Sequence, residues 1–191
     1  MSKKITIPFL EETLKILSAG DSVLISGTLY IARDAAHKRM YETLETGGQL
    51  PFDIENQVFY YAGPTPAKAN QVVGSVGPTT SGRMDKYAPA LLDRGLKGMI
   101  GKGYRNQEVK DAMVTNSAIY LAAIGGSGAL IAKSFKNVEL IAYGDLGPEA
   151  IYKGEIENFP AIVINDIYGA DWYELGVMNF KEVESKSGEV N

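Results

Sequence analysis

The chain contains no cysteine among its 191 residues, and it has one histidine and one tryptophan. The lack of cysteine excludes disulfides, a catalytic thiolate and any cysteine-held zinc or iron–sulfur site built by this chain alone. His37 is the only histidine, and no acidic cluster has the spacing of a calcium loop. We therefore expect no metal to be held by this chain alone, and any transition metal to come from elsewhere.

Long apolar runs and an excess of basic charge are also missing. No stretch of about eighteen apolar residues occurs, and no long apolar segment follows the two lysines of the opening. We expect no membrane association and a cytoplasmic location. A net charge of −4 and a pI near 5.1 disfavour nucleic acid as a partner. The hydrophobic fraction of 45% is typical of a globular domain, so we expect a packed core.

Helical and strand-like segments alternate along the chain. The expected helices cover 9–20, 33–48, 85–95, 105–116 and 127–136. The expected strands cover 21–32, 56–63, 67–77, 95–103, 118–126, 138–145 and 160–169. This alternation predicts an α/β domain, and its sheet should be mixed because helices do not separate all the early strands. One domain over 1–180 and a polar tail over 181–191 are expected.

The stretch GSVGPTTSGRMD, from Gly74 to Asp85, is the most unusual segment. Its glycines allow tight turns and close approach to a ligand, while Thr79, Thr80 and Ser81 could cap a following helix. Amides at that helix start, together with Arg83, would attract an anion. A helix-capping loop and an anion-binding loop explain the pattern equally well. Neither a Walker loop nor a GxGxxG motif is present.

Two further segments place a cation where a strand should end. In IARDAAHKR, Arg33 follows a strand and His37 lies one turn later. Such edges commonly carry ligand contacts in α/β folds. In MIGKG, Lys102 lies between two glycines, which leave its ammonium group unobstructed. Each cation could be an ordinary surface charge and His37 a structural histidine, but Arg33, Arg83 and Lys102 together could hold a ligand with two carboxylates.

The other polar and aromatic features favour structural roles. The aromatic residues interpreted as core or edge packing in strand-like runs are Tyr60, Tyr61 and Trp172. The GGSG segment from Gly125 to Gly128 fits either a tight connection or a second ligand-facing loop. Asp145 and Glu149 flank a Leu-Gly-Pro turn and are interpreted as solvated turn residues.

Four motifs resemble the β subunit of two-subunit class I fumarate hydratases, and equally that of L(+)-tartrate dehydratases. In order along the chain, they are GTLYIARDAAHKRM, YYAGPTP, GSVGPTTSGRMDKY and GMIGKG. The resemblance extends from about Thr6 to Tyr173. It implies a swivelling β/β/α domain with a mixed sheet, similar to a domain of aconitase. It also implies a hydro-lyase reaction: fumarate is reversibly hydrated to L-malate, or L(+)-tartrate is dehydrated to oxaloacetate.

The resemblance also implies which residues form the site. Arg33, Arg83 and Lys102 would bind substrate carboxylates, and Thr79 would abstract the proton beside a carboxylate. A threonine hydroxyl is a poor base, so its proton should pass to a carboxylate of the α subunit. Of the supporting residues, the aspartates and the histidine would orient the arginines. The supporting residues are Asp34, His37, Gly77, Thr80, Ser81, Asp85, Gly101 and Gly103.

A partner subunit is part of the same resemblance. A [4Fe–4S] cluster would be held by cysteines of the α subunit, with one iron acting as a Lewis acid on the substrate hydroxyl. The chain would be active only with that subunit, in an assembly of two α and two β subunits. A hypothesis of another class is a non-catalytic anion-binding or assembly module that uses the same loop.

Overall fold

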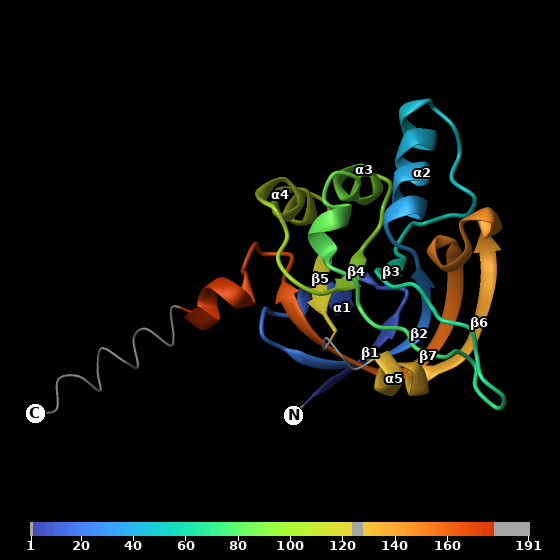
Figure 1. Cartoon of the computed structure of the whole chain (residues 1–191). Helices are drawn as coiled ribbons and strands as arrows, with labels where there is room; N and C mark the ends of the chain where they lie inside the picture. The colour runs from blue at the N-terminus through green and yellow to red at the C-terminus, as the bar shows by residue number, and fades with distance from the viewer. Residues whose placement is uncertain (1, 124–127, 178–191) are drawn as a thin grey trace, which may run out of the picture.

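The computed structural model describes residues 2–123 and 128–177 (Figure 1). The strands are β1 (Lys3–Ile7), β2 (Ser22–Ile31), β3 (Val58–Tyr60), β4 (Gly98–Gly101), β5 (Ile119–Ala122), β6 (Phe135–Ala142) and β7 (Ile151–Asn165). The helices are α1 (Glu11–Lys15), α2 (Asp34–Glu45), α3 (Ala88–Leu92), α4 (Gln107–Thr115) and α5 (Gly128–Ile131). Short 3-10 turns are η1 (Ser81–Met84), η2 (Ala132–Ser134) and η3 (Gly144–Glu149). The predicted α/β class is confirmed.

These strands form one mixed sheet in the order β1-β2-β3-β4-β5-β7-β6. Strands β1 to β5 are parallel to one another, whereas β7 is antiparallel to β2, β5 and β6. Because β7 pairs with both β2 and β5, the strands β2, β3, β4, β5 and β7 close on themselves like a small barrel. The mixed sheet was predicted, but its closure was not.

The length and bend of β7 make this closure possible. Its 15 residues pair with β2 from Tyr152 to Ile162, and with β5 from Ile162 to Asn165. A register shift interrupts the long β2–β7 ladder between Ile25 and Gly27 of β2, where β7 has one extra residue between Ile156 and Phe159. Irregularities of this kind bend a strand and increase its twist, which a closed sheet requires.

Strand residues alternate between the barrel interior and an outer layer under the helices. Leu29, Tyr60, Ile100, Leu121 and Phe159 belong to the inner cluster. The outer cluster includes strand residues such as Phe59, Met99 and Tyr120. Figure 1 shows α2, α3 and α4 together on one side of the sheet, where their apolar faces cover this outer layer. Burial of the strands on both faces explains their nearly continuous apolar runs.

Residues 67–77, which were expected to form a strand, form a loop instead. The loop folds onto itself: the Thr65 amide donates to the Ser75 carbonyl, and the Gly74 amide donates to the Thr65 carbonyl. The side chains of Val73 and Val76 are buried in the inner cluster. The apolar pattern here therefore marks two buried anchors, and the local hydrogen bonds replace those of a strand.

Other element boundaries also differ from the prediction. The helix expected over 9–20 is limited to α1, and the one over 85–95 is reduced to α3, which follows the turn η1. The described part of 127–136 forms α5 and η2 and then enters β6, because Phe135 packs into the barrel against Phe159. Strand β1 was not predicted. The other expected helices and strands each overlap an observed element of the same type.

The aromatic predictions have two outcomes. Tyr60 and Tyr61 are fully buried, so their interpretation as packing residues is confirmed. Trp172 does not lie in a strand: it begins a helical turn over 172–177 and packs over Gly20, where a Cβ would lie 2.6 Å from its ring. The predicted polar tail 181–191 and residues 125–127 of GGSG lie outside the described residues. None of the described helices is long and apolar enough to cross a membrane.

The position of Gly27 predicts a strong effect of substitution on stability. Its φ is +121°, and a Cβ there would lie 2.1 Å from the Ile7 carbonyl oxygen of β1. We expect Gly27→Ala to lower the free energy of unfolding by about 2 kcal/mol or more, since both backbone strain and a clash arise. Gly176→Ala is the matched control, because a Cβ there meets no atom within 4 Å. Equal denaturation midpoints for the two variants would contradict this account.

Candidate active site

The three cationic side chains expected in the site lie on segments that follow neighbouring strands at one edge of the sheet. Arg33 follows β2 and occupies the N-cap position of α2, and Lys102 follows β4 directly. Arg83 lies in η1, within the segment that joins β3 to α3. Because β2, β3 and β4 are adjacent and parallel, the segments that follow them begin at the same edge. Arg33 and Lys102 thus lie just beyond strand ends, as predicted, whereas Arg83 lies in a helical turn.

The segment around Thr79 is inserted between the diverging ends of β3 and β4. The last direct hydrogen bond between these two strand ends is donated by the Tyr61 amide to the Ile100 carbonyl. Beyond it, the Thr79 amide donates to the Tyr61 carbonyl (2.6 Å), and the Lys102 amide donates to the Thr79 carbonyl (3.2 Å). The Ser81 amide then donates to the Lys102 carbonyl (2.8 Å). The backbone of the loop is thereby held as an extra strand, which fixes Thr79 beside Lys102.

Two glycines make this insertion possible. A Cβ on Gly101 would lie 2.0 Å from the Ser81 hydroxyl oxygen, so the loop occupies the space that a side chain would need. Gly103 has a φ of +82°, a conformation that favours glycine. Its carbonyl accepts from the Tyr120 hydroxyl (2.9 Å), whose oxygen is also bonded to Ser81 (2.9 Å). These glycines accommodate the protein's own loop.

The hydroxyl groups of the loop do not cap the turn that follows. Thr80 is the N-cap residue of η1 and makes no side-chain capping bond, and the Ser81 hydroxyl is bonded to Tyr120. Thr79 is partly exposed and Thr80 is exposed. The helix-capping interpretation of the motif therefore lacks the hydrogen bonds on which it depended. Gly77, another supporting residue, lies apart from these contacts, beside Gly128.

One aspartate joins the two arginines. Asp34 accepts from the Nε of Arg33 (3.0 Å) with one carboxylate oxygen and from the Nε of Arg83 (2.6 Å) with the other. Within residues 2–123 and 128–177, no acceptor pairs with the terminal nitrogens of Arg83. Half of the Arg83 side chain is exposed. Both guanidinium groups are thus fixed at Nε, which leaves both terminal nitrogens of Arg83 to bind a carboxylate end-on.

The charge of Asp34 is stabilised by its neighbours. Partial burial acts to raise its pKa, but the hydrogen bond from Arg33 and the charge of Arg83 outweigh burial and lower the pKa of Asp34. The aspartate is therefore ionised at neutral pH and offers two acceptor oxygens to the arginines. Lys102 is exposed and adds a third cation at the same edge.

His37 lies beneath this group and is fully buried. Its Nδ1 is 3.1 Å from the Arg33 carbonyl, to which it donates, and its ring packs edge-on against Phe59 and Tyr61. Burial lowers the pKa of His37 to about 4. The imidazole is therefore neutral at physiological pH and contacts the backbone of Arg33 rather than its guanidinium.

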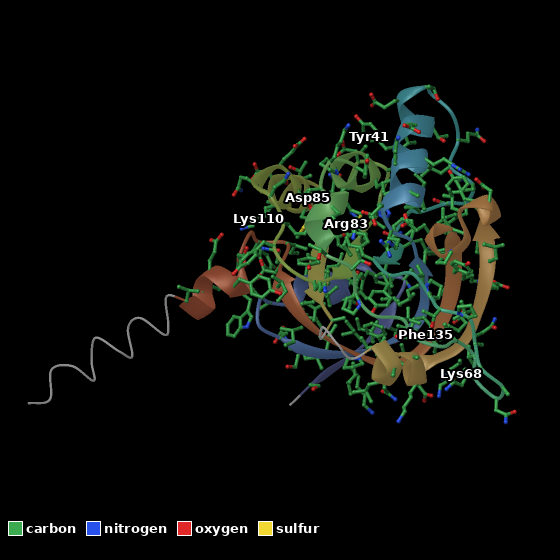
Figure 2. The ribbon with its side chains drawn as sticks, viewed as in Figure 1. Tyr41, Lys68, Arg83, Asp85, Lys110 and Phe135 are labelled. Atoms are coloured by element: carbon green, nitrogen blue, oxygen red, sulfur yellow. The ribbon has the colours of Figure 1, made fainter. Side chains whose placement is uncertain are left out.

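Asp85 orients a different arginine from those expected. Its carboxylate pairs with Arg105 Nε (2.7 Å) and accepts from the Asn106 amide (2.7 Å) at the start of α4. Arg105 is buried and lies over the rings of Tyr61 and Tyr120, which support the loop around Thr79. Figure 2 shows Asp85 and Arg83 between the α2 and α4 sides of the molecule. No sequence pattern indicated Arg105.

Glu149 is the second site residue that the sequence did not indicate. It was interpreted as a solvated turn residue, but it is partly buried and contacts the start of α2. One carboxylate oxygen lies 3.4 Å from Arg33 Nη2, and the other accepts from the Ala35 amide (2.9 Å). Asp145, in the same turn, pairs with Arg39 on α2. Both acidic residues are therefore in ion pairs.

The family model described as "Fumarase C-terminus" matches residues 2–176. The chain belongs to this family. Over 152 residues it is 42% identical to "Fumarate hydratase class I, anaerobic" of Escherichia coli (strain K12), which covers 78% of this chain and 28% of that protein. Over 156 residues it is 40% identical to "Fumarate hydratase 2" of Leishmania major, covering 81% of this chain and 28% of that protein.

A third relative has nearly the same length as the matched region. It is the Methanocaldococcus jannaschii protein named "Putative L(+)-tartrate dehydratase subunit beta", 38% identical over 170 residues, or 86% of this chain and 87% of that protein. The chain thus spans about 28% of the fumarate hydratases above, but most of the archaeal relative. These homologues are named as hydro-lyases.

The residues that the structure describes provide no ligand set for an iron–sulfur cluster. The chain has no cysteine, and no group of three histidine, cysteine or acidic residues among those described could hold a metal ion. The site residues instead offer guanidinium, ammonium and hydroxyl groups. Such groups bind carboxylates and do not ligate an iron–sulfur cluster.

The burial of His37 predicts how stability depends on pH. Its pKa of about 4 in the folded chain lies below the ordinary 6.5, so the unfolded chain takes up the proton first as pH falls. This contribution is complete above pH 6.5 and is lost as pH falls toward 4, at a total of about 3 kcal/mol. His37→Phe should lack this part of the pH dependence of unfolding. The single imidazole signal in NMR should titrate near pH 4, and a midpoint near 6.5 would contradict the prediction.

Proposed function

We propose that this chain is the β subunit of a two-subunit hydro-lyase that reversibly hydrates fumarate to L-malate. The observation that carries the proposal is the joint anchoring of Arg33 and Arg83 at Nε by Asp34, which leaves terminal donors for a ligand. A dicarboxylate has two planar anionic groups that match such guanidinium ends. Family membership and the relatives named as fumarate hydratases support the same reaction.

Each of the three cations has a binding role in the proposal. Arg33 and Arg83 bind substrate carboxylates through their free nitrogens, and Lys102 adds an exposed ammonium group at the adjacent strand end. The paired Asp34 prevents either guanidinium from turning away at Nε. This arrangement orients the substrate before reaction, which lowers the entropic part of the barrier.

Thr79 is the proposed proton-abstracting group at the carbon beside a carboxylate. The backbone bonds to Tyr61 and Lys102 fix its position at the edge where the cations gather. In dehydration its hydroxyl oxygen would take the substrate proton while its own proton passes to a carboxylate. Among the described residues no carboxylate is hydrogen-bonded to the Thr79 hydroxyl. We therefore assign this acceptor to the partner subunit.

The partner in this proposal is an iron–sulfur α subunit that holds a [4Fe–4S] cluster, and the assembly contains two α and two β subunits. The absence of cysteine in this chain supports that division of labour, and the archaeal relative is named as a β subunit. We also propose that the closed sheet with its helical layer is a swivelling β/β/α domain similar to one of aconitase.

Dehydration of L(+)-tartrate to oxaloacetate is the second candidate function. The archaeal relative, of which this chain covers 87%, carries that activity in its name. Fumarate and tartrate are both four-carbon dicarboxylates, so the arginine pair serves either substrate.

Reconstitution tests the function directly. The chain is combined anaerobically with the cysteine-bearing α subunit, and fumarate loss and oxaloacetate formation from L(+)-tartrate are followed separately. We expect fumarate hydration by the mixture and none by the separate chains. Turnover of tartrate alone selects the second candidate. Dicarboxylate binding by the chain without activity in any mixture supports the non-catalytic module instead.

Replacement of Arg83 tests its binding role in the assembled enzyme. We expect Arg83→Ala to lower kcat/KM by about ten- to a hundredfold, the usual loss when one hydrogen bond to a charged group is removed. Arg83→Lys should recover little, since an ammonium group cannot form the same end-on pair. Arg94→Ala, an exposed arginine after α3, is the control. Normal kinetics for Arg83→Ala would refute the assigned role.

A further inference from the structure

We infer that Glu149 is a positioning residue that holds the guanidinium of Arg33 in its ligand-binding orientation. The inference rests on the proposed function for its kinetic consequence, and on the contacts of Glu149 for its geometry. Glu149 ends η3, in the connection between β6 and β7. The connection between these two antiparallel strands therefore reaches the edge of the sheet where the three cations lie.

The start of α2 lacks a conventional cap. Arg33 is the N-cap residue and its side chain makes no capping bond, because a guanidinium cannot accept one. Glu149 supplies the missing acceptor from a distant part of the chain through its bond from the Ala35 amide (2.9 Å). A carboxylate is favourable at a helix N-terminus, where backbone amides are unpaired. Arg33 can thus occupy a capping position and still extend toward a ligand.

The same carboxylate limits how Arg33 can turn. Its other oxygen lies 3.4 Å from Arg33 Nη2, while Asp34 holds Nε at 3.0 Å. Asp34 holds Nε by a hydrogen bond and Glu149 forms an ion pair with Nη2, so the two carboxylates together restrict rotation about the bonds near the guanidinium. Nη1 has no acceptor among the described residues, so it remains for a carboxylate from outside.

The stem of Arg33 is also enclosed. A Cβ on Gly63 would lie 3.4 Å from Arg33 Cδ and 3.0 Å from the Pro148 carbonyl oxygen. Arg33 therefore passes through a narrow space between the end of β3 and the residue before Glu149. The turn that carries Glu149 is held on α2 a second time by Asp145, which binds Arg39 at 2.8 and 2.7 Å. Both side chains of this second pair are exposed, and the pair is separate from the contacts of Glu149 with Arg33 and Ala35.

The kinetic test uses the assembled enzyme. Glu149→Gln keeps an oxygen to accept from Ala35 but removes the charge beside Arg33. We expect its KM to rise about tenfold with kcat within about twofold, because substrate and transition state lose the same carboxylate contact. Asp145→Asn is the matched control, since it breaks an ion pair between the same turn and the same helix. An unchanged KM in Glu149→Gln, or an equal rise in Asp145→Asn, would overturn the inference.

A double-mutant cycle separates positioning from simple stabilisation of α2. In an Arg33→Ala background, Glu149→Gln should raise KM no further, because the side chain that it positions is gone. Effects that add in full would show that Glu149 acts on the fold alone.

A measurement on the full chain without its partner separates this inference from the proposed function. In NMR of the guanidinium nitrogens, rotation about the Arg33 Nε–Cζ bond should be slow in the native chain, faster in Glu149→Gln and unchanged in Asp145→Asn. Equal rotation in all three proteins would overturn the inference whatever reaction the enzyme catalyses. Restricted rotation in a chain that activates no α subunit would support the positioning of Arg33 and reject the proposed function.

Discussion

The double pairing of β7 is the constraint on which the rest of the structure depends. One edge of this strand bonds to β2 and the other bonds to β5, so the sheet closes on itself. Within this closed sheet β2, β3 and β4 are adjacent and parallel, so the segments that follow them begin at one edge. The same strand also places its preceding turn, with Glu149, against the start of α2. The cations gather because of the topology, before any interaction between their side chains.

Short polar contacts then define the arrangement at that edge. The loop around Thr79 is hydrogen-bonded to the ends of both β3 and β4, and it occupies the space that a side chain at position 101 would need. Asp34 is shared by Arg33 and Arg83, so neither guanidinium moves independently of the other. Underneath, the buried pair of Arg105 and Asp85 connects η1 to the start of α4. Preorganisation of this kind favours a ligand through geometry more than through net charge.

The local features of the fold were predictable, and the long-range ones were not. The helix expected over 33–48 contains α2, because apolar spacing and a closing glycine pair mark it clearly. The strand expected over 67–77 was wrong, because the two buried valines of this loop, Val73 and Val76, resemble a strand in sequence. Strand order and closure depend on pairings that no local pattern encodes. Glu149 was missed for that reason: 114 residues separate it from Ala35, and the intervening segments must fold before the two meet.

The burial of the only histidine has a consequence for how activity can vary with acidity. Histidine is the side chain that ordinarily changes its charge between pH 5 and 8, and His37 remains neutral throughout that range. Asp34, whose pKa is lowered by its neighbours, stays ionised there. The charge states of His37 and Asp34 at the edge of the sheet therefore do not change across physiological pH. Any optimum near neutrality must reflect ionisation of groups other than these two.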